Sequence, residues 1–477
     1  MMKSPDPALN TIPDNPQTIH LTAACGTAMA ALACLLDAAG YRVTGSDQNI
    51  YPPMSDLLNH RDIPIASGFA AGNLAHGPDL VVVGNAVSRD NPEVQKMIEM
   101  ALPYCSMPQA VNRFAAAGKD ILLVCGTHGK TTTSALLAWI LHTAGLDPSF
   151  MIGGMVGGFD GNFRAGGGPH MVIEGDEYDT AFFDKRSKFF HYDPAITILT
   201  GIEFDHADIF KNLAAVKQTF RQFLTGLRGD SLLLAFDGDE NVAELTNDLA
   251  CTVRPYGRTE AAHWRLDDIQ ITPPHTRFAA LSGHHLFGRF SAPLTGAHNL
   301  SNMLAAIGAA SAAGVTEHHI CEALATFKGV KRRQEVRGVK NQITVMDDFA
   351  HHPTAVRETI NGIKPFYPDG RLIAVFEPRT NTSMRNVFQQ DYARAFDNAD
   401  LICISEPPLP EKVPERQRFS SSRLVGDLAR QGKSAHCFPD ADAIVDYLKT
   451  AARPGDLILV MSNGGFDNIH EKLMAAL

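Results

Sequence analysis

The chain has 477 residues and a formal net charge of −10 at pH 7, with 45% hydrophobic and 20% charged residues. This composition is ordinary for a globular protein, and the length allows two to four domains with their own cores. The negative charge argues against a general nucleic-acid or anionic-membrane surface, and no apolar run in the sequence approaches membrane-span length.

Residues 1–18, at the start of the chain, are polar and rich in proline and lack the apolar core of a signal peptide. We therefore expect a disordered tail there. The eight cysteines form no C-x-x-C pair. This pattern favours reduced thiols in the cytoplasm over disulfides or a zinc site.

A first α/β unit is predicted for residues 19–112. An apolar strand leads into Gly26, Thr27 and a helix rich in alanine and leucine. Asp47 ends the next strand, and Asn85 lies in a third apolar segment. This layout is typical of a nucleotide-binding βαβ unit. The glycine pattern of the first turn is poor, so a tight turn without a ligand is an equal alternative.

Residues 121–133, ILLVCGTHGKTTT, carry the strongest functional signal. An apolar strand, a glycine-rich loop with Lys-Thr and a helical pattern follow one another, as in phosphate-binding loops. Lys130 would neutralise the β- and γ-phosphates, and Thr131 would hold Mg²⁺. The spacing G-x-x-G-K-T is two residues shorter than usual, and the alternative is a glycine-rich turn with a surface lysine. The predicted phosphate contacts are Gly126, Thr127, His128, Gly129, Lys130, Thr131 and Thr132.

Acidic side chains follow the next two predicted strands. Glu174-Gly-Asp176-Glu177 ends one strand, and Asp205-His206 ends another. Catalytic groups gather at the carboxyl ends of strands in open α/β sheets. One carboxylate of the first group could complete the Mg²⁺ shell begun by Thr131, and His206 could reach a second metal. The alternatives are a solvated acidic turn and a structural Asp-His pair.

Three polar clusters lie around the start of a third unit. His298, Asn299 and Asn302 open a predicted helix, where an amide could cap the helix or meet the edge of adenine. Arg332-Arg333 precedes the third unit and could stabilise phosphoryl charge or form a solvated linker. Asp347-Asp348 and His351-His352 precede a helix that begins at Pro353, so capping explains part of that cluster.

The remaining segments complete a three-domain organisation. Residues 113–334 form the second domain, with a small antiparallel insertion expected within 251–295. Residues 335–477 repeat strand-then-loop patterns, which predicts a second parallel sheet. Arg379 and Arg385 lie after one of these strands, and their planar side chains suit the recognition of carboxylates. A solvated basic loop is the alternative for this pair.

The ordered series GTHGKTT, EGDE, EFDH, HNLSN, RRQE and DDFAHHP resembles the Mur ligase family of ATP-dependent amide-bond ligases. The N-terminal GTAM…GSD and VGNAVSRDNP resemble the UDP-muramate-binding domain of that family. The stretches IYPPMSDLL, EPRTNTSMR and VMSNGGFDNIHEKL resemble its peptide-adding branch. The resemblance implies an α/β, three-domain architecture: a Rossmann-like N-terminal domain, a central P-loop ATPase-like domain and a C-terminal Rossmann-like domain.

The resemblance also implies residue roles. Catalytic roles fall to Lys130, Glu174, His206 and Arg333. Metal binding falls to Thr131, Glu174 and His206. ATP binding beyond the loop falls to His298, Asn299, Asn302, Arg333 and Asp348. UDP-muramate binding falls to Gly26, Thr27, Asp47 and Asn85, and peptide binding to Arg379 and Arg385. Two departures from the family pattern are Gly201, where an Asn is frequent, and Arg221, where several relatives carry a carbamylated lysine.

The implied reaction uses ATP and Mg²⁺ to join the lactyl carboxylate of UDP-N-acetylmuramate to L-Ala-γ-D-Glu-meso-diaminopimelate through an acyl phosphate. The implied setting is peptidoglycan recycling by a cytoplasmic monomer. The nearest alternative is addition of L-alanine to the same nucleotide sugar. From another class, a nicotinamide-dependent dehydrogenase is disfavoured by the poor glycine fingerprint and the distant phosphate loop.

Overall fold

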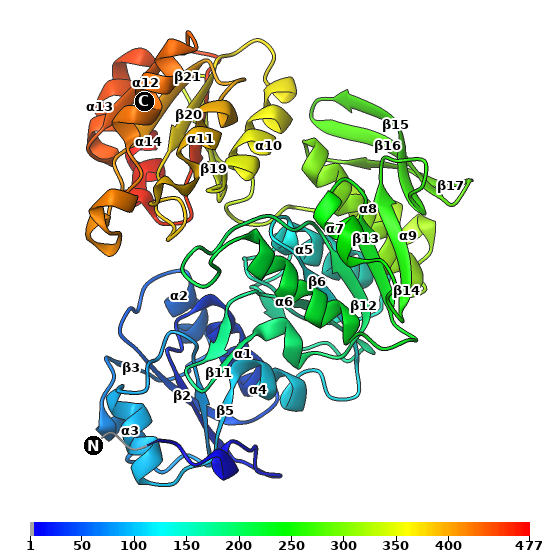
Figure 1. Ribbon diagram of the computed structural model, residues 1–477, viewed down its shortest axis with the longest axis vertical. Coiled ribbons are helices and arrows are strands. Elements are labelled where there is room, and N and C mark those ends of the chain that lie inside the picture. The colour runs from blue at the N-terminus through cyan, green and yellow to red at the C-terminus, as the bar shows by residue number, and fades with distance from the viewer. Residues whose placement is uncertain (1–3) are drawn as a thin grey trace. The chain divides into compact units, whose positions relative to one another are not determined.

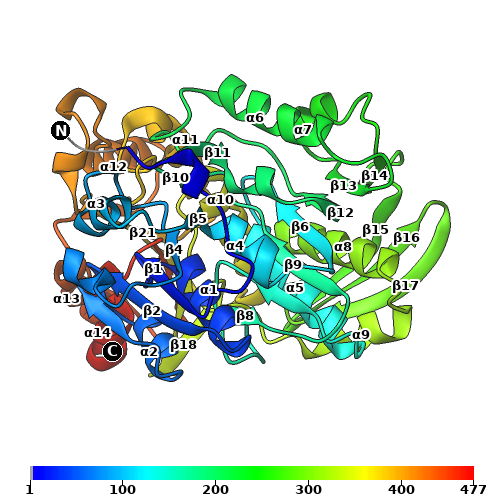
Figure 2. The same cartoon turned by 90° about the horizontal axis from the view of Figure 1, so that it is seen from below.

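The computed structural model describes residues 4–477, which form two compact units. Unit 1 comprises Met1–Ile202, Lys217–Trp264 and Ala305–Ala323, and unit 2 comprises Glu203–Val216, Arg265–Leu304 and Leu324–Leu477. Strands and helices alternate along most of the chain (Figure 1, Figure 2). Within residues 4–477, no helix is both long and apolar enough to cross a membrane.

The first sheet of unit 1 has five parallel strands in the order β3-β2-β1-β4-β5. Its strands are β1 Thr18–Thr22, β2 Arg42–Asp47, β3 Ile65–Ser67, β4 Leu80–Val83 and β5 Tyr104–Ser106. Its helices are α1 Thr27–Ala38, α2 Met54–Asn59, α3 Pro92–Glu99 and α4 Met107–Phe114, with the short helices η1 Pro7–Leu9 and η2 Ala71–Leu74. The strand order reverses between β1 and β4, and ligands bind at such a point in open α/β sheets.

Seven neighbouring strands of the central sheet lie in unit 1, in the order β14-β13-β12-β6-β9-β7-β8. They are β6 Asp120–Cys125, β7 Ser149–Met151, β8 Phe163–Arg164, β9 His170–Glu174, β12 Pro194–Leu199, β13 Leu232–Phe236 and β14 Thr252–Gly257. The strands β9, β6 and β12 are consecutive and parallel. The loops that follow these three strands therefore begin at the same end of the sheet, where the carboxyl ends of the strands lie.

The other elements of the middle of the chain are mostly helical. The helices are α5 Lys130–Thr143, α6 Leu213–Thr225, α7 Glu240–Leu245, α8 Ala297–Ala312 and α9 Glu317–Thr326. A short antiparallel pair, β10 Asp179–Ala181 and β11 Asp184–Ser187, precedes η3 Lys188–His191. The expected insertion is formed by β15 Trp264–Thr272, β16 His275–Ser282 and β17 His285–Ala292, of which β16 and β17 pair antiparallel.

The C-terminal sheet of unit 2 has six strands in the order β18-β19-β23-β20-β21-β22. They are β18 Glu335–Lys340, β19 Ile343–Asp348, β20 Leu372–Phe376, β21 Leu401–Ser405, β22 Ala435–Phe438 and β23 Leu457–Met461. The helices are α10 Pro353–Ile363, α11 Gln389–Ala395, α12 Ser421–Arg430, α13 Ala441–Ala451 and α14 Ile469–Ala476, with η4 Lys364–Phe366, η5 Asn386–Phe388, η6 Pro410–Lys412, η7 Glu415–Gln417 and η8 Phe466–Asn468. All strand pairs except β18–β19 are parallel.

Strand β20 shows why this sheet is buried on both faces. Leu372 and Phe376 belong to one hydrophobic cluster, whereas Ile373 and Val375 belong to another. Successive side chains of a strand point to opposite faces, so an uninterrupted apolar run requires cover on each face. The predicted parallel α/β architecture is confirmed.

Residues 4–17 of the expected tail contain a short helix and hydrogen bonds to β5. Pro7–Leu9 is a short helix, with the Asp6 side chain accepting a hydrogen bond from the backbone of Ala8. The Asn10 amide donates to the Tyr104 carbonyl oxygen at 3.2 Å, and the Tyr104 hydroxyl donates to the Asp6 carbonyl oxygen at 3.3 Å. Composition does not reveal such partners. Residues 1–3 lie outside the described residues.

Candidate active site

The glycine-rich loop after β6 has the backbone of a phosphate-binding loop. Gly126 and Gly129 have φ angles of 122° and 80°, which favour glycine, and α5 begins directly after them at Lys130. The Thr127 N–H donates to the Gly201 carbonyl oxygen at 2.8 Å, so the segment after β12 supports the loop. The loop therefore presents the N-terminus of a 14-residue helix, where anions bind.

Lys130 is held by acceptors of its own loop and by an acidic side chain. Its ammonium donates to the Gly126 carbonyl oxygen at 2.6 Å and to Glu177 Oε2 at 2.7 Å. Burial alone would lower the pKa of Lys130, but the neighbouring Glu177 carboxylate raises it above its usual value. Burial raises the pKa of Glu177 to about 7, although Lys130 opposes that shift. The sequence pattern predicts no separate role for Glu177, one of three acids at and after the end of β9.

Thr131 and Glu174 meet as expected for a magnesium site. The Thr131 hydroxyl donates to Glu174 Oε1 at 3.1 Å, and Glu174 Oε2 accepts the Gly153 N–H at 2.7 Å. A hydroxyl and a carboxylate side by side are the oxygen ligands that Mg²⁺ prefers, so these residues fit the ion. Asp176 instead pairs with Lys188, which holds the Asp176 pKa below its usual value although burial raises it. Glu174 is therefore the carboxylate of this turn that suits the metal.

In unit 2, the loop of residues 203–208 contacts the loop before α10 through side chains. Buried Asp205 lies 3.5 Å from His351 Nε2, and this contact outweighs burial and holds the Asp205 pKa well below its usual value. The His352 ring lies 3.2 Å from the Phe204 carbonyl oxygen and 3.4 Å from Glu203. His206 has a φ of 55°, an uncommon conformation for a non-glycine residue that is often found at functional sites.

Gln334 links the residues that were expected to contact ATP in unit 2. Its N–H donates to Asp348 Oδ2 at 2.8 Å, and its Oε1 accepts from the Asn299 amide at 3.3 Å. Its Nε2 lies 3.4 Å from the His298 ring, and the Asn302 amide donates to Asn299 at 3.2 Å. The structure therefore brings His298, Asn299, Asn302 and Asp348 together through Gln334. Its place directly after Arg333 in RRQE was the only sequence signal for this residue.

The two neighbouring arginines are used differently. Arg332 donates to the carbonyl oxygens of Ser462 and Gly464 at 2.6 and 2.7 Å, and its Nε lies 3.3 Å from Asp347. The Arg333 guanidinium lies 4.6 Å from the centre of the Phe349 ring. Burial raises the pKa of Asp348, and Arg333 opposes that shift. Arg332 thus bonds the backbone after β23, and the role of Arg333 toward phosphate stays a prediction.

The predicted peptide-binding arginines lie in different surroundings. Arg379 Nη1 lies 3.4 Å from Glu377, whose other oxygen accepts the Ser462 hydroxyl at 2.5 Å. A Cβ atom at Gly464 would overlap Arg379 Cδ, so glycine is required for this approach. Arg385 instead donates to Gln417 at 2.7 Å and joins a backbone bridge to Arg418. Only Arg379, with 37% of its side chain exposed, is both available and backed by a carboxylate.

The predicted UDP-muramate contacts lie around the strand reversal of the first sheet. Gly26, Thr27 and Asn85 are exposed beyond the carboxyl ends of β1 and β4. Asp47 is buried, and it accepts the Cys25 N–H at 2.8 Å and the Asn49 N–H at 2.9 Å. Asp47 therefore shapes the turn before α1, and its contact with a ligand stays a prediction.

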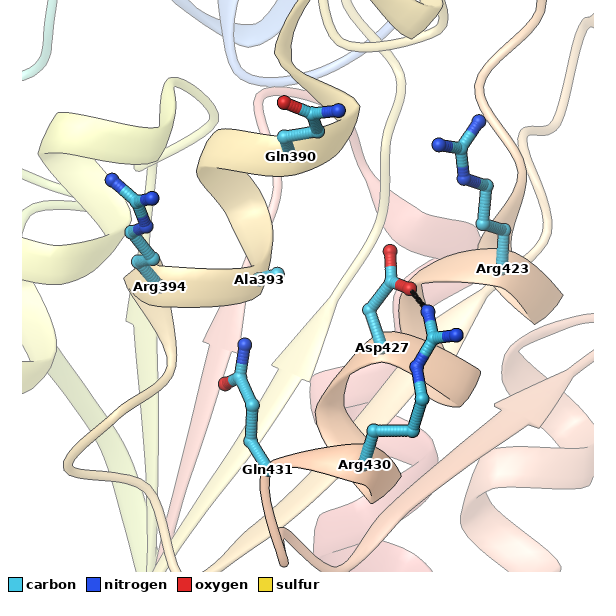
Figure 3. A pocket seen from close by; sticks show the side chains of 7 residues that line it. All are labelled: Gln390, Ala393, Arg394, Arg423, Asp427, Arg430 and Gln431. Atoms are coloured by element: carbon cyan, nitrogen blue, oxygen red, sulfur yellow. Dashed lines mark hydrogen bonds and ion pairs between the residues drawn. The ribbon is translucent and has the colours of Figure 1, made fainter.

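A hollow of about 420 Å³ lies between α11 and α12 in unit 2. Figure 3 shows Arg394 and Arg423 on either side and an ion pair between Asp427 and Arg430. None of the residues expected to act in catalysis or binding lines this hollow. The hollow is therefore separate from the residues that the sequence predicts to act in catalysis and binding.

The chain belongs to the Mur ligase family, whose members are ATP-dependent, ADP-forming ligases. Family models match it in three consecutive stretches. They are described as "Mur ligase family, catalytic domain" for residues 18–119, "Mur ligase middle domain" for residues 124–310 and "Mur ligase, glutamate ligase domain" for residues 332–464. The predicted family and fold class are confirmed, and the protein is an enzyme of this class.

Individual relatives include both branches that act on UDP-N-acetylmuramate. The chain is 40% identical over 461 residues to a UDP-N-acetylmuramate–L-alanyl-γ-D-glutamyl-meso-2,6-diaminoheptandioate ligase of Escherichia coli (strain K12), covering 96% of this chain and 98% of that protein. It is 33% identical over 458 residues to a UDP-N-acetylmuramate–L-alanine ligase of Caldanaerobacter subterraneus, covering 96% and 97%. The crystal structure of a murein peptide ligase from Psychrobacter arcticus is similar with a TM-score of 0.71 and 34% identity, covering 96% and 98%.

Proposed function

We propose that this ligase joins the lactyl carboxylate of UDP-N-acetylmuramate to the amino group of L-Ala-γ-D-Glu-meso-diaminopimelate, with conversion of ATP to ADP and phosphate. The observation that carries the chemistry is the convergence of Lys130, Thr131 and Glu174 at the start of α5. The choice of peptide is supported by 40% identity to a ligase named for that reaction, against 33% for a ligase named for L-alanine.

The reaction divides into two transfers. A lactyl carboxylate oxygen attacks the γ-phosphorus of ATP, the bond to the β,γ-bridging oxygen breaks, and ADP leaves. The peptide amine then attacks the carbonyl carbon of the acyl phosphate, loses a proton and expels inorganic phosphate. The first transfer is needed because a carboxylate is a poor electrophile.

The residues of the site have separate tasks in these steps. Lys130 offsets the charge that develops on the phosphoryl group, and the N–H groups of its loop orient the phosphates. Thr131 and Glu174 would hold Mg²⁺, which supplies further charge neutralisation when bound. We assign the adenine side to Asn299 and Asn302.

Recognition of the peptide is assigned to unit 2. Arg379 offers a planar, charged donor to a peptide carboxylate, and Glu377 keeps it in place. The proposal includes a cytoplasmic monomer that acts in peptidoglycan recycling. The free thiols of all eight cysteines are compatible with a reducing compartment.

The test measures phosphate release by the purified protein with ATP, Mg²⁺ and UDP-N-acetylmuramate. We expect kcat/KM for the tripeptide to exceed that for free L-alanine by roughly 10²-fold or more, because several carboxylates contribute charged hydrogen bonds. A preference for L-alanine would refute the peptide assignment and leave the ligase chemistry intact. No phosphate release with either amine would refute both.

A further inference from the structure

The Lys130 ammonium donates hydrogen bonds to four oxygen atoms of the protein. It has three protons to donate. Their acceptors are the carbonyl oxygens of Gly126 and Thr127, at 2.6 and 3.3 Å, and the two carboxylate oxygens of Glu177, at 2.7 and 3.0 Å. The first two acceptors belong to the phosphate loop, whereas Glu177 lies 47 residues further along the chain.

The Lys130–Glu177 pair is buried, with 12% and 2% of the two side chains exposed. The other acids of the same turn have partners of their own. Asp176 pairs with Lys188, and Glu174 accepts hydrogen bonds from Thr131 and the Gly153 N–H. Lys130 is therefore the counter-ion of Glu177, and an unpartnered charge at this depth would be costly.

A phosphate group can bond Lys130 only by replacing one of these contacts. The two carbonyl oxygens lie on the loop that would surround the phosphates, so contacts to them are compatible with a lysine that faces the ligand. Glu177 carries the same charge as a phosphate and competes for the same protons. If a phosphate oxygen replaces Glu177 as the partner of Lys130, the ammonium still has a negatively charged partner.

We propose that Glu177 is a positioning residue: it holds Lys130 against the phosphate loop in the nucleotide-free enzyme and yields it to the γ-phosphate when ATP binds. The role rests on the proposed function, because it assumes that the loop binds ATP. The arrangement keeps the loop neutral and ordered before the nucleotide arrives. It also weakens nucleotide affinity, because the competing contact must first be broken.

The holding contact is tested without nucleotide, by acylation of lysines with an amine-reactive anhydride and mass spectrometry of the full-length protein. Glu177→Gln keeps the side-chain shape and removes the charge. We expect Lys130 acylation to rise severalfold, because an ammonium released from the Glu177 carboxylate is more accessible to the reagent. Lys188 serves as an internal reference, and Asp193→Asn, which removes a surface charge paired with Arg228, serves as the matched control. Equal Lys130 acylation in Glu177→Gln and wild type would overturn the proposal.

The exchange is tested by titration with Mg²⁺ and the imidodiphosphate analogue of ATP. If Glu177 holds Lys130 in nine tenths of the molecules, Glu177→Gln should bind the analogue roughly tenfold more tightly. A merely structural Glu177 would instead give equal or weaker binding, which would overturn the exchange. If Glu177→Gln does not fold, Glu177→Asp replaces it, and its shorter carboxylate should raise both readouts in the same direction. Failure of the wild type to bind the analogue, together with raised acylation in the variant, would refute the ATP site while supporting the holding contact.

Discussion

Replacement of Lys130 by alanine separates the catalytic role of this residue from its structural one. The change removes the ammonium group of Lys130, and only 12% of the Lys130 side chain is exposed. Loss of one preorganised donor at a site of developing charge costs roughly 10²- to 10³-fold in turnover, about 2.7–4 kcal/mol. We therefore expect kcat for ADP formation to fall by that factor.

The structural consequence depends on pH because Glu177 loses its counter-ion. Its pKa is raised to about 7 by burial even with Lys130 present, so the folded protein binds the proton more tightly than the unfolded chain. The stability that this carboxyl group contributes below its unfolded pKa is therefore lost as the pH rises to about 7. Lys130 lowers this pKa, so in its absence the loss continues to a higher pH. In Lys130→Ala the melting temperature should fall more at pH 8 than at pH 6, with a cost at pH 8 of up to roughly 3–5 kcal/mol.

The double variant Lys130→Ala with Glu177→Gln separates the two effects. It should recover the melting temperature at pH 8 without recovering turnover, because the unpaired charge is gone while the phosphate still lacks its ammonium. Turnover is measured as ADP release in a coupled assay, and folding is monitored by circular dichroism. Near-normal ADP release by a folded Lys130→Ala protein would refute the assignment of the phosphate loop.

Three further expectations concern the metal, the peptide and the first sheet. Glu174→Ala and His206→Ala should each raise the Mg²⁺ concentration that gives half-maximal turnover by roughly tenfold or more. The effect of Glu174→Ala should be the larger. An unchanged Mg²⁺ dependence in both variants would contradict the metal site. Arg379→Ala should raise KM for the tripeptide by roughly 10- to 10²-fold and leave KM for ATP unchanged, and intact tripeptide kinetics would contradict the peptide assignment. Burial raises the pKa of Glu93, but bonds from His20 and other side chains outweigh it, so the net pKa is lowered. The stabilisation by Glu93 is thus lost as the pH falls below the pKa of this group in the unfolded chain. The difference in melting temperature between the wild type and Glu93→Gln should therefore narrow from pH 6 to pH 3. A constant difference would contradict this linkage.

The parts of the site that lie within one motif could be predicted from the sequence. A strand, a glycine-rich loop and a helix fix the relative positions of Gly126, Lys130 and Thr131, since few backbone paths connect these elements. Glu174 followed because it ends a neighbouring parallel strand, and the carboxyl ends of such strands share an edge. Apolar runs were sufficient to predict strands such as β4, β6 and β23.

Side-chain pairing across long sequence separations could not be predicted. Nothing in EGDE distinguishes Glu177, which holds Lys130, from Asp176, which holds Lys188. The difference depends on the direction in which the turn after β9 leaves the sheet. Likewise, RRQE does not reveal that Arg332 bonds the carbonyl oxygens after β23. Arg332 also has a φ of 61°, an uncommon conformation for a non-glycine residue that its sequence pattern does not indicate.

The position of β12, β6 and β9 inside the central sheet bears on directed evolution. Each of these strands has a hydrogen-bonded neighbour on both sides. Local unfolding that starts at the β8 edge of the sheet therefore disrupts β8 before it reaches the loops of the phosphate site. Heat inactivation should therefore accompany cooperative melting of the sheet rather than precede it. Residual ligase activity after a heat challenge would then report how much of a variant library remains folded, and stabilised variants could be selected by activity alone.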